Sequence, residues 1–193
     1  MTKNRLEAFS DGVLAIIITV MVLELKRPDR ADFSALLSLS PVLLSYVLSF
    51  VYVGIYWNNH HHMFHATKRV NGTILWANLH LLFWISLFPF ATAWMGENHV
   101  RPAPTAVYGI VLFMAGTAYY VLQSAIIADE GPESVLARAV GRDWKGKLSP
   151  VIYIIAIALA FVSSWIAIGL YTLVAIMWLI PDRRIERALS TSP

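Results

Sequence analysis

Residues 5–25 read RLEAFSDGVLAIIITVMVLEL, and this stretch decides the fold. As a helix, about 21 residues at roughly 1.5 Å each cover the roughly 30 Å hydrocarbon thickness of a bilayer. Ser10 and Asp11 nevertheless lie inside this apolar segment. An ionisable side chain in a spanning helix costs at least ~2.5 kcal/mol on insertion scales. Asp11 therefore needs a polar partner within the protein or a water-filled path, and it is the first candidate functional residue.

The helix formed by this segment has two different faces. Projection at about 100° per residue separates Ser10 and Asp11 from a second, largely apolar stripe. That stripe contains Arg5, Phe9, Gly12, Ile16, Thr19, Val20 and Leu23. From periodicity alone, the stripe fits either a face where identical helices meet or the plain packing face of an apolar helix.

The composition places the whole chain in a membrane. Hydrophobic residues make up 58% of the 193 residues, charged residues 14%, and the mean hydropathy is +0.61. The chain has no cysteine, which excludes disulfides, thiolate metal sites and cysteine nucleophiles. Its net charge of +3 comes from basic residues in short loops between apolar segments, so membrane topology explains it better than nucleic-acid binding. The sequence has no phosphate-binding glycine loop or nucleophile-elbow motif, and we expect no enzyme activity.

The apolar segments predict an all-α integral membrane protein, with residues 1–193 forming one domain of six transmembrane helices. Residues 148–180 would make a helix of about 50 Å, too long for one span, so we divide them near Ser163 and Ser164. Pro89 is expected to kink the third span. The expected spans are residues 5–25, 36–57, 73–95, 105–128, 148–163 and 165–180.

Basic residues predict that both termini are cytoplasmic, because positive charge is enriched in inner loops. Eleven basic residues then lie inside: Lys3, Arg5, Lys68, Arg69, Arg138, Arg142, Lys145, Lys147, Arg183, Arg184 and Arg187. Four lie outside: Lys26, Arg27, Arg30 and Arg101.

Several motifs indicate a family. The first span contains Arg5-x-x-x-Phe9-Ser10-Asp11-Gly12, followed by Ala15-Ile16 and Thr19. Later stretches are Tyr56-Trp57-x-x-His60-His61-x-x-Phe64, Trp76-x-Asn78-Leu79 and Leu87-Phe88-Pro89-Phe90. Together they resemble the signature of the endolysosomal potassium channel family and its prokaryotic homologues, over most of the chain.

This resemblance implies passive, potassium-selective conduction through a homotetramer whose first helices line a central pore. It implies that Ile16 and Leu23 form apolar constrictions and that Thr19 contributes a ring of hydroxyls, with Val20 on the same face. Rings of branched aliphatic side chains can gate a pore by dewetting. K⁺ is then the permeant ion, and the only expected partners are copies of the chain and the bilayer of a prokaryotic plasma (inner) membrane. No cofactor, small-molecule substrate or nucleic acid is expected.

Asp11 and Ser10 have two interpretations, a permeation or proton site and a buried hydrogen-bonded network that fixes the first helix. Helical projection places Asp11 roughly opposite Ile16, which favours the network. The expected partners are His60, His61, Trp76 and Asn78, and the resemblance also implies that the Phe9-Ser10-Asp11 motif packs against polar residues of the second and third helices. Arg5 either pairs with Asp11 or another acid, or extends to the membrane interface.

Two further patterns superficially resemble ion sites. His61 and His65 have the spacing of a helical zinc pair, but no acid or cysteine lies nearby in sequence, so we expect no metal. Residues 105–109 read TAVYG, which lacks the central glycine of the potassium-filter sequence TVGYG. We interpret these residues as the start of a helix, so any potassium preference must come from side chains.

Two alternatives to a potassium channel remain. A proton-coupled secondary transporter or a proton-conducting channel would use Asp11 and the histidines, but no inverted repeat or pair of broken helices marks a transporter site. A non-conducting membrane scaffold would leave the first-helix stripe as ordinary packing.

Overall fold

The computed structural model describes residues 2–28, 30–140 and 144–179, and every regular element within them is a helix. The helices are α1 Lys3–Leu23, α2 Phe33–Ser38, α3 Ser40–His65, α4 Gly72–Ser86, α5 Phe88–Glu97, α6 Pro102–Glu130, α7 Val135–Val140, α8 Trp144–Leu159 and α9 Ser164–Leu179. Arg142, Arg183, Arg184 and Arg187, which contributed to the orientation argument, lie outside the described residues.

Within the described residues, four helical segments are long and apolar enough to cross a membrane. They are α1, α3, the combined α4 and α5 over Gly72–Glu97, and α6. Helices α8 and α9 have 16 residues each, or about 24 Å, which is shorter than the roughly 30 Å hydrocarbon layer. The chain is therefore an all-α integral membrane protein, and the count of six spans stays a prediction.

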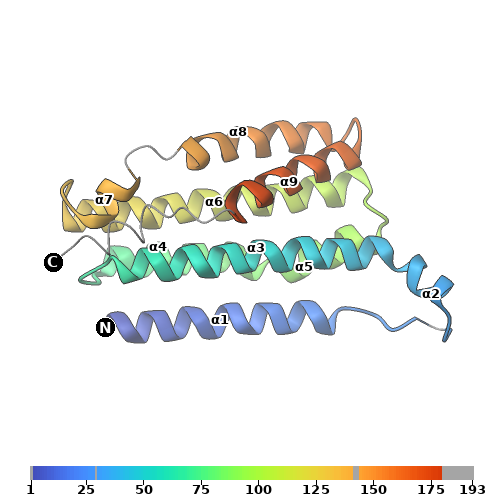
Figure 1. Ribbon diagram of the computed structural model, residues 1–193, viewed down its shortest axis with the longest axis horizontal. Helices are drawn as coiled ribbons and strands as arrows, with labels where there is room; N and C mark the ends of the chain where they lie inside the picture. The colour runs from blue at the N-terminus through green and yellow to red at the C-terminus, as the bar shows by residue number, and fades with distance from the viewer. Residues whose placement is uncertain (1, 29, 141–143, 180–193) are drawn as a thin grey trace.

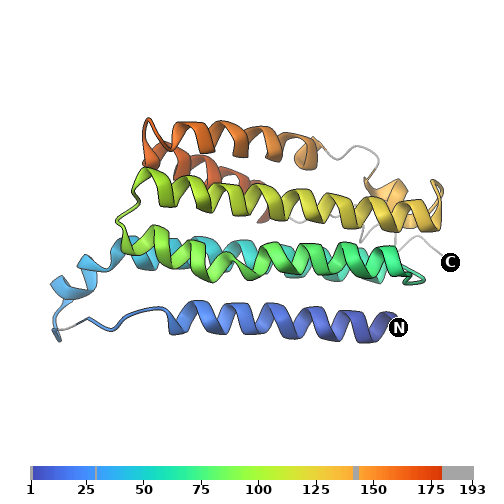
Figure 2. The same cartoon turned by 180° about the vertical axis from the view of Figure 1, so that it is seen from behind.

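The long helices run back and forth along the long axis of the molecule, which is horizontal in Figure 1, and they are stacked in layers. Helix α1 lies along one side of the bundle and contacts α3, α4 and α5, while α6, α8 and α9 form the opposite side. The reverse view shows the same order, with α1 at the edge (Figure 2). The start of α1, the α3–α4 loop and α7 lie at one end of the bundle, and the loops that follow α1, α5 and α8 lie at the other. One whole side of α1 is thus left without a neighbour from the described part of its own chain.

The helix boundaries differ from the expected spans at the second helix. Helix α3 continues to His65, so the polar connection expected from Asn58 onward begins with two more helical turns. No glycine or proline interrupts this part of the chain, and His60 and Phe64 are buried there. At Pro89 the chain does not merely kink, because α4 ends at Ser86 and α5 begins at Phe88 with the proline in its first turn.

The long apolar stretch at the C-terminal side is divided by a tight turn. Helix α8 ends at Leu159 and α9 begins at Ser164. The Ser163 amide donates to the Leu159 carbonyl at 2.8 Å and the Ser164 hydroxyl to the Ala160 carbonyl at 3.3 Å. Polar groups of the turn are therefore satisfied within it, as a membrane interior or its interface requires.

A hydroxyl-rich core holds α3, α5, α6 and α9 together. The Ser49 hydroxyl lies 2.6 Å from that of Thr92 and 2.9 Å from that of Tyr108, and all three side chains are buried. The Tyr171 hydroxyl donates to the Thr105 carbonyl at 3.2 Å. In hydrocarbon, such groups have no water to bond, so these pairs fix how the helices face one another.

The segment that superficially resembles a potassium filter belongs to this core. Residues 105–109 lie within α6, which starts at Pro102. A Cβ on Gly109 would overlap the Tyr171 hydroxyl and lie 2.6 Å from its Cζ atom. This glycine therefore makes room for the tyrosine to reach the helix backbone.

Candidate ion pathway on the first helix

Helix α1 packs against the bundle along a single stripe. The buried residues recur every three or four positions and are Leu6, Ser10, Leu14, Ile17 and Met21. This spacing places all five on one face, which meets α3, α4 and α5. Val13 and Ile18 beside this stripe are partly buried, and most of the remaining surface of the helix is exposed in the described chain.

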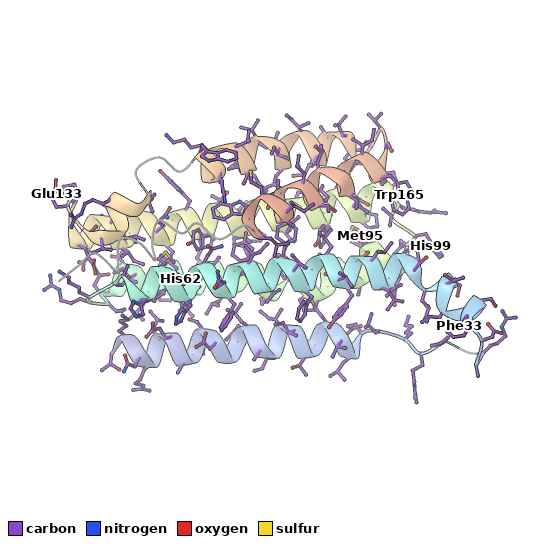
Figure 3. The ribbon with its side chains drawn as sticks, in the orientation of Figure 1. Phe33, His62, Met95, His99, Glu133 and Trp165 are labelled. Carbon is purple, nitrogen blue, oxygen red and sulfur yellow. The ribbon has the colours of Figure 1, made fainter. Side chains whose placement is uncertain are left out.

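The uncovered surface contains the stripe that was singled out in the sequence. Ile16 is 64% exposed, Val20 38% and Leu23 77%, and Thr19 is also exposed. Phe9 is 48% exposed and continues the same stripe toward the start of the helix. Side chains of α1 project into open space on the side away from α3 (Figure 3). An apolar face of this length on a membrane-spanning helix needs either lipid or another subunit against it.

The hydroxyl of Thr19 is the polar atom at the centre of the exposed stripe. It donates to the Ala15 carbonyl at 2.9 Å, one turn back in the same helix. Because this bond uses the hydroxyl proton, the oxygen lone pairs are free to accept or to coordinate a cation. The stripe therefore carries one group that can replace part of an ion's hydration, between aliphatic side chains that cannot.

A buried polar network joins α1 to α3 and α4. The Asn78 amide nitrogen donates to the Ser10 hydroxyl at 3.0 Å, and its amide oxygen lies 2.8 Å from Nε2 of His60. Ser10 in turn donates to the Leu6 carbonyl at 2.9 Å. Ser10 and Asn78 are fully buried and His60 is 2% exposed. The network brings together three of the residues expected from the sequence and sets the rotation of α1 about its axis.

Asp11 is not part of this network, and the expected partners of Asp11 were wrong. Its carboxylate accepts a hydrogen bond from Trp57 Nε1 at 3.1 Å, and both side chains are exposed in the single chain. Asp11 lies about 100° around the helix from Ser10, so it meets Trp57, one turn before His60 on α3, rather than the His60–Asn78 pair. The sequence motif contained Trp57, but the indole was not assigned a role there.

The remaining expected members of the network lie apart from it. Arg5 is exposed and forms no salt bridge with a described residue. The His61 ring stacks on Trp57 at 6.4 Å between centroids, on the exposed side of α3. Trp76 is 75% exposed on α4. Within the described chain, no three His, Cys, Asp or Glu side chains are grouped as metal ligands.

A groove separates the second half of α1 from α5. It has a volume of about 640 Å³ and is lined by Ile16, Val20 and Glu24 on one side and by Phe90 and Trp94 on the other. At its end the Lys26 ammonium lies 2.6 Å from Glu97, and this contact raises the pKa of Lys26 through the hydrogen bond and the negative charge. The first half of α1 is thus held by the buried network, while the second half packs through Leu14, Ile17 and Met21 and borders the groove.

Comparisons with known proteins find ion channels, although the relatives are named for different ions. Residues 5–89 match the family model described as the endosomal/lysosomal potassium channel TMEM175. A protein of Chryseobacterium sp. (strain P1-3) named a potassium channel is 56% identical over 189 residues, covering 98% of each chain. A zebrafish (Danio rerio) protein named an endosomal/lysosomal proton channel is 40% identical over 81 residues, which cover 35% of this chain and 16% of that protein.

A solved structure matches the fold along nearly the whole chain. It is the crystal structure of a lysosomal potassium-selective channel TMEM175 homologue from Chamaesiphon minutus. The TM-score is 0.83 at 30% sequence identity, covering 93% of this chain and 97% of the other.

Proposed function

The chain belongs to the TMEM175 potassium channel family, and we propose that it conducts K⁺ passively through a homotetrameric pore lined by the exposed face of α1. It is an integral membrane channel protein and not an enzyme. The proposal adds the position of the pore, the number of subunits and the gating residues.

The exposure of one α1 stripe is the observation that supports this position most directly. Ile16 and Leu23 are among the exposed large apolar side chains, while the opposite stripe of the same helix is buried. One helix cannot enclose a pore, so the proposal requires several copies of the chain. Four copies would bring four α1 helices together around an axis.

In this arrangement the aliphatic rings act as the gate. Removing water from a cation is not compensated by aliphatic carbon, so a narrow ring of Ile16 or Leu23 side chains excludes ions. Rotation or separation of the α1 helices would widen the rings and let water in. The groove beside the second half of α1 leaves room for such a movement, whereas the Ser10–Asn78–His60 network restrains the first half.

The test is ion flux in liposomes containing the purified protein. Reversal potentials under potassium and sodium gradients should show potassium selectivity, and Ile16→Ala or Leu23→Ala should raise the basal flux several-fold by wetting the pore. Val22→Ala is the matched control, since Val22 is a 44% exposed side chain of α1 that lies outside the stripe. Equal flux in the three variants and the original chain would remove the stripe from the ion path.

A second candidate function is proton conduction. Curated animal relatives are named proton channels, and Asp11 is exposed beside Trp57 rather than buried. A pH gradient without a potassium gradient tests it in the same liposomes. Proton flux that persists in Asp11→Asn would assign the protons to another route.

We further propose a prokaryotic plasma (inner) membrane location with both termini cytoplasmic. The described helices place the start of α1 and the α3–α4 loop at one end of the bundle, opposite the α5–α6 loop. Reporter fusions after Pro28, Arg69 and Glu97 should read outside, inside and outside, and a C-terminal fusion should read inside. A C-terminal fusion on the outer side would contradict the six-span topology.

A further inference from the structure

A small cavity lies within each subunit on the side away from α1. Its walls come from α3, α6, α8 and α9, and its volume is about 60 Å³. Aromatic side chains form much of the wall, among them Tyr56, Tyr119, Tyr153 and Trp178, and Tyr120 at its edge is 65% exposed. Since a water needs roughly 10–15 Å³, the space holds several waters or the end of a small molecule.

Two buried polar groups in this cavity have no partner among the described residues. The Tyr56 side chain is 8% exposed and that of Gln123 is 6% exposed, yet neither the phenol hydroxyl nor the amide forms a hydrogen bond within the described chain. Every described side-chain nitrogen or oxygen that is sealed from solvent does have a partner. The two groups are therefore open to the cavity that they line. Unpaired polar groups at this depth are costly unless something in the cavity bonds them.

Several other polar groups of the wall are already engaged. Trp178 Nε1 donates to the Ser149 hydroxyl at 2.9 Å, and the Tyr153 hydroxyl donates to that of Tyr52 at 3.3 Å. The Asn59 amide nitrogen donates to the Ile55 carbonyl at 3.0 Å. Among the polar wall side chains that are more than nine-tenths buried, Tyr56 and Gln123 are thus the two without a hydrogen bond in the described chain.

We propose that this cavity binds an uncharged hydroxyl group carried on a short aliphatic chain. A hydroxyl both donates and accepts, so it can bond the Tyr56 phenol and the Gln123 amide together. None of the described residues that line the cavity is charged, so within this lining a charged group would be desolvated without compensation. A cavity of roughly 150 Å³ holds benzene, so the smaller volume favours an aliphatic group over a ring. The hydroxyl belongs either to a free alcohol or to an uncharged lipid such as a monoacylglycerol.

A ligand in the cavity contacts α3, the helix to which α1 is bonded, so it should also affect conduction. This inference rests on the proposed function. Tyr56 faces the cavity, and the next residue of α3, Trp57, donates to Asp11 of α1. One turn further, His60 belongs to the buried network. A ligand that fixes Tyr56 should therefore change the potassium flux as well as bind.

The test uses the full-length protein in lipid nanodiscs and ¹⁹F NMR of 3,3,3-trifluoropropan-1-ol. Saturable binding is expected, with competition by 1-propanol if the site is open to free alcohols and by monooleoylglycerol if a lipid hydroxyl reaches it. The analogue 1,1,1-trifluoropropane, which lacks the hydroxyl, should bind at least several-fold more weakly. Gln123→Leu and Tyr56→Phe should each weaken the alcohol about three- to tenfold, the loss of one hydrogen bond, without affecting the analogue.

Glycine substitutions supply a variant that fills the cavity without disturbing the fold. A Cβ on Gly116 would lie 3.7 Å from the Tyr56 hydroxyl and 3.8 Å from Tyr153, ordinary contact distances inside the cavity. Gly116→Ala should therefore fold normally and lose most of the binding. Gly169→Ala is the matched control, because a Cβ there meets no atom within 4 Å.

Two results would overturn the proposal. One is the absence of saturable alcohol binding, and the other is binding that Gly116→Ala and Gln123→Leu both leave unchanged. Potassium flux in liposomes distinguishes the proposed coupling between cavity and α1 from the proposed pore. Flux that is normal but insensitive to saturating alcohol would overturn the coupling and leave the pore proposal intact.

Discussion

Two regions of the molecule use the same chemistry with opposite consequences. One is the interface of α1 with α3, α4 and α5, which we call the seam, and the other is the core formed by α3, α5, α6 and α9. Each contains buried polar pairs among apolar side chains, Ser10 with Asn78 in the seam and Ser49 with Tyr108 in the core. Helices α3, α5 and α6 have neighbouring helices of the same chain on both flanks, whereas α1 lies at the edge of the bundle and is buried along one stripe. The same kind of contact therefore immobilises the core and leaves the other face of α1 open for the proposed ion path.

The largest expected effect is in the core. Gly109→Ala places a methyl group onto the Tyr171 hydroxyl and 2.8 Å from Ile157 Cγ1. Tyr171 is fully buried and bonded to the Thr105 carbonyl, so it cannot move aside cheaply, and we expect a loss of about 1–3 kcal/mol or more. The melting temperature of the detergent-solubilised protein measures it. Gly54→Ala, where a Cβ meets nothing within 4 Å, should melt like the original chain.

The next effect is at the seam. Asn78→Leu keeps the side-chain size but leaves His60 without its partner, at a cost of roughly 1–3 kcal/mol. The oligomer should also dissociate more readily in size-exclusion chromatography, since α1 would no longer be held in one rotation. Asn98→Leu is the control, because that amide donates to the Trp94 carbonyl at an exposed helix end. If both variants were equally stable, the buried network would not hold α1.

Asp11 provides a smaller effect that separates it from Ser10. Its single hydrogen bond to Trp57 lies on the exposed surface, so Asp11→Ala should cost less than about 1 kcal/mol of stability. A double-mutant cycle with Trp57→Phe measures the coupling between the two side chains by thermal melting. A loss as large as that of Asn78→Leu would mean that Asp11 is buried by a neighbouring subunit.

The sequence predicted the elements better than their contacts. The apolar segments gave the helices, and helical projection separated the faces of α1, because both follow from a period of 3.6 residues. Projection also placed Asp11 away from Ile16, but the partner of Asp11 depends on the rotation of α3, which no local pattern in the sequence specifies. The extension of α3 through His65 was missed because its polar histidines read as a loop, although one of them, His60, faces inward.

The smallest effect on stability should accompany a clear effect on function. Thr19→Val preserves the side-chain shape and removes an exposed oxygen, so the melting temperature should change little while the potassium-to-sodium permeability ratio falls. The control is Thr117→Val in α6, whose hydroxyl makes the same bond one turn back, to the Phe113 carbonyl at 2.9 Å, but lies away from α1. Reversal potentials in liposomes distinguish the two. Removing the hydroxyl costs each helix the same local bond, so a selectivity change confined to Thr19→Val must arise from what the oxygen faces. An equal change in both variants would instead assign the effect to helix distortion and remove Thr19 from the ion path.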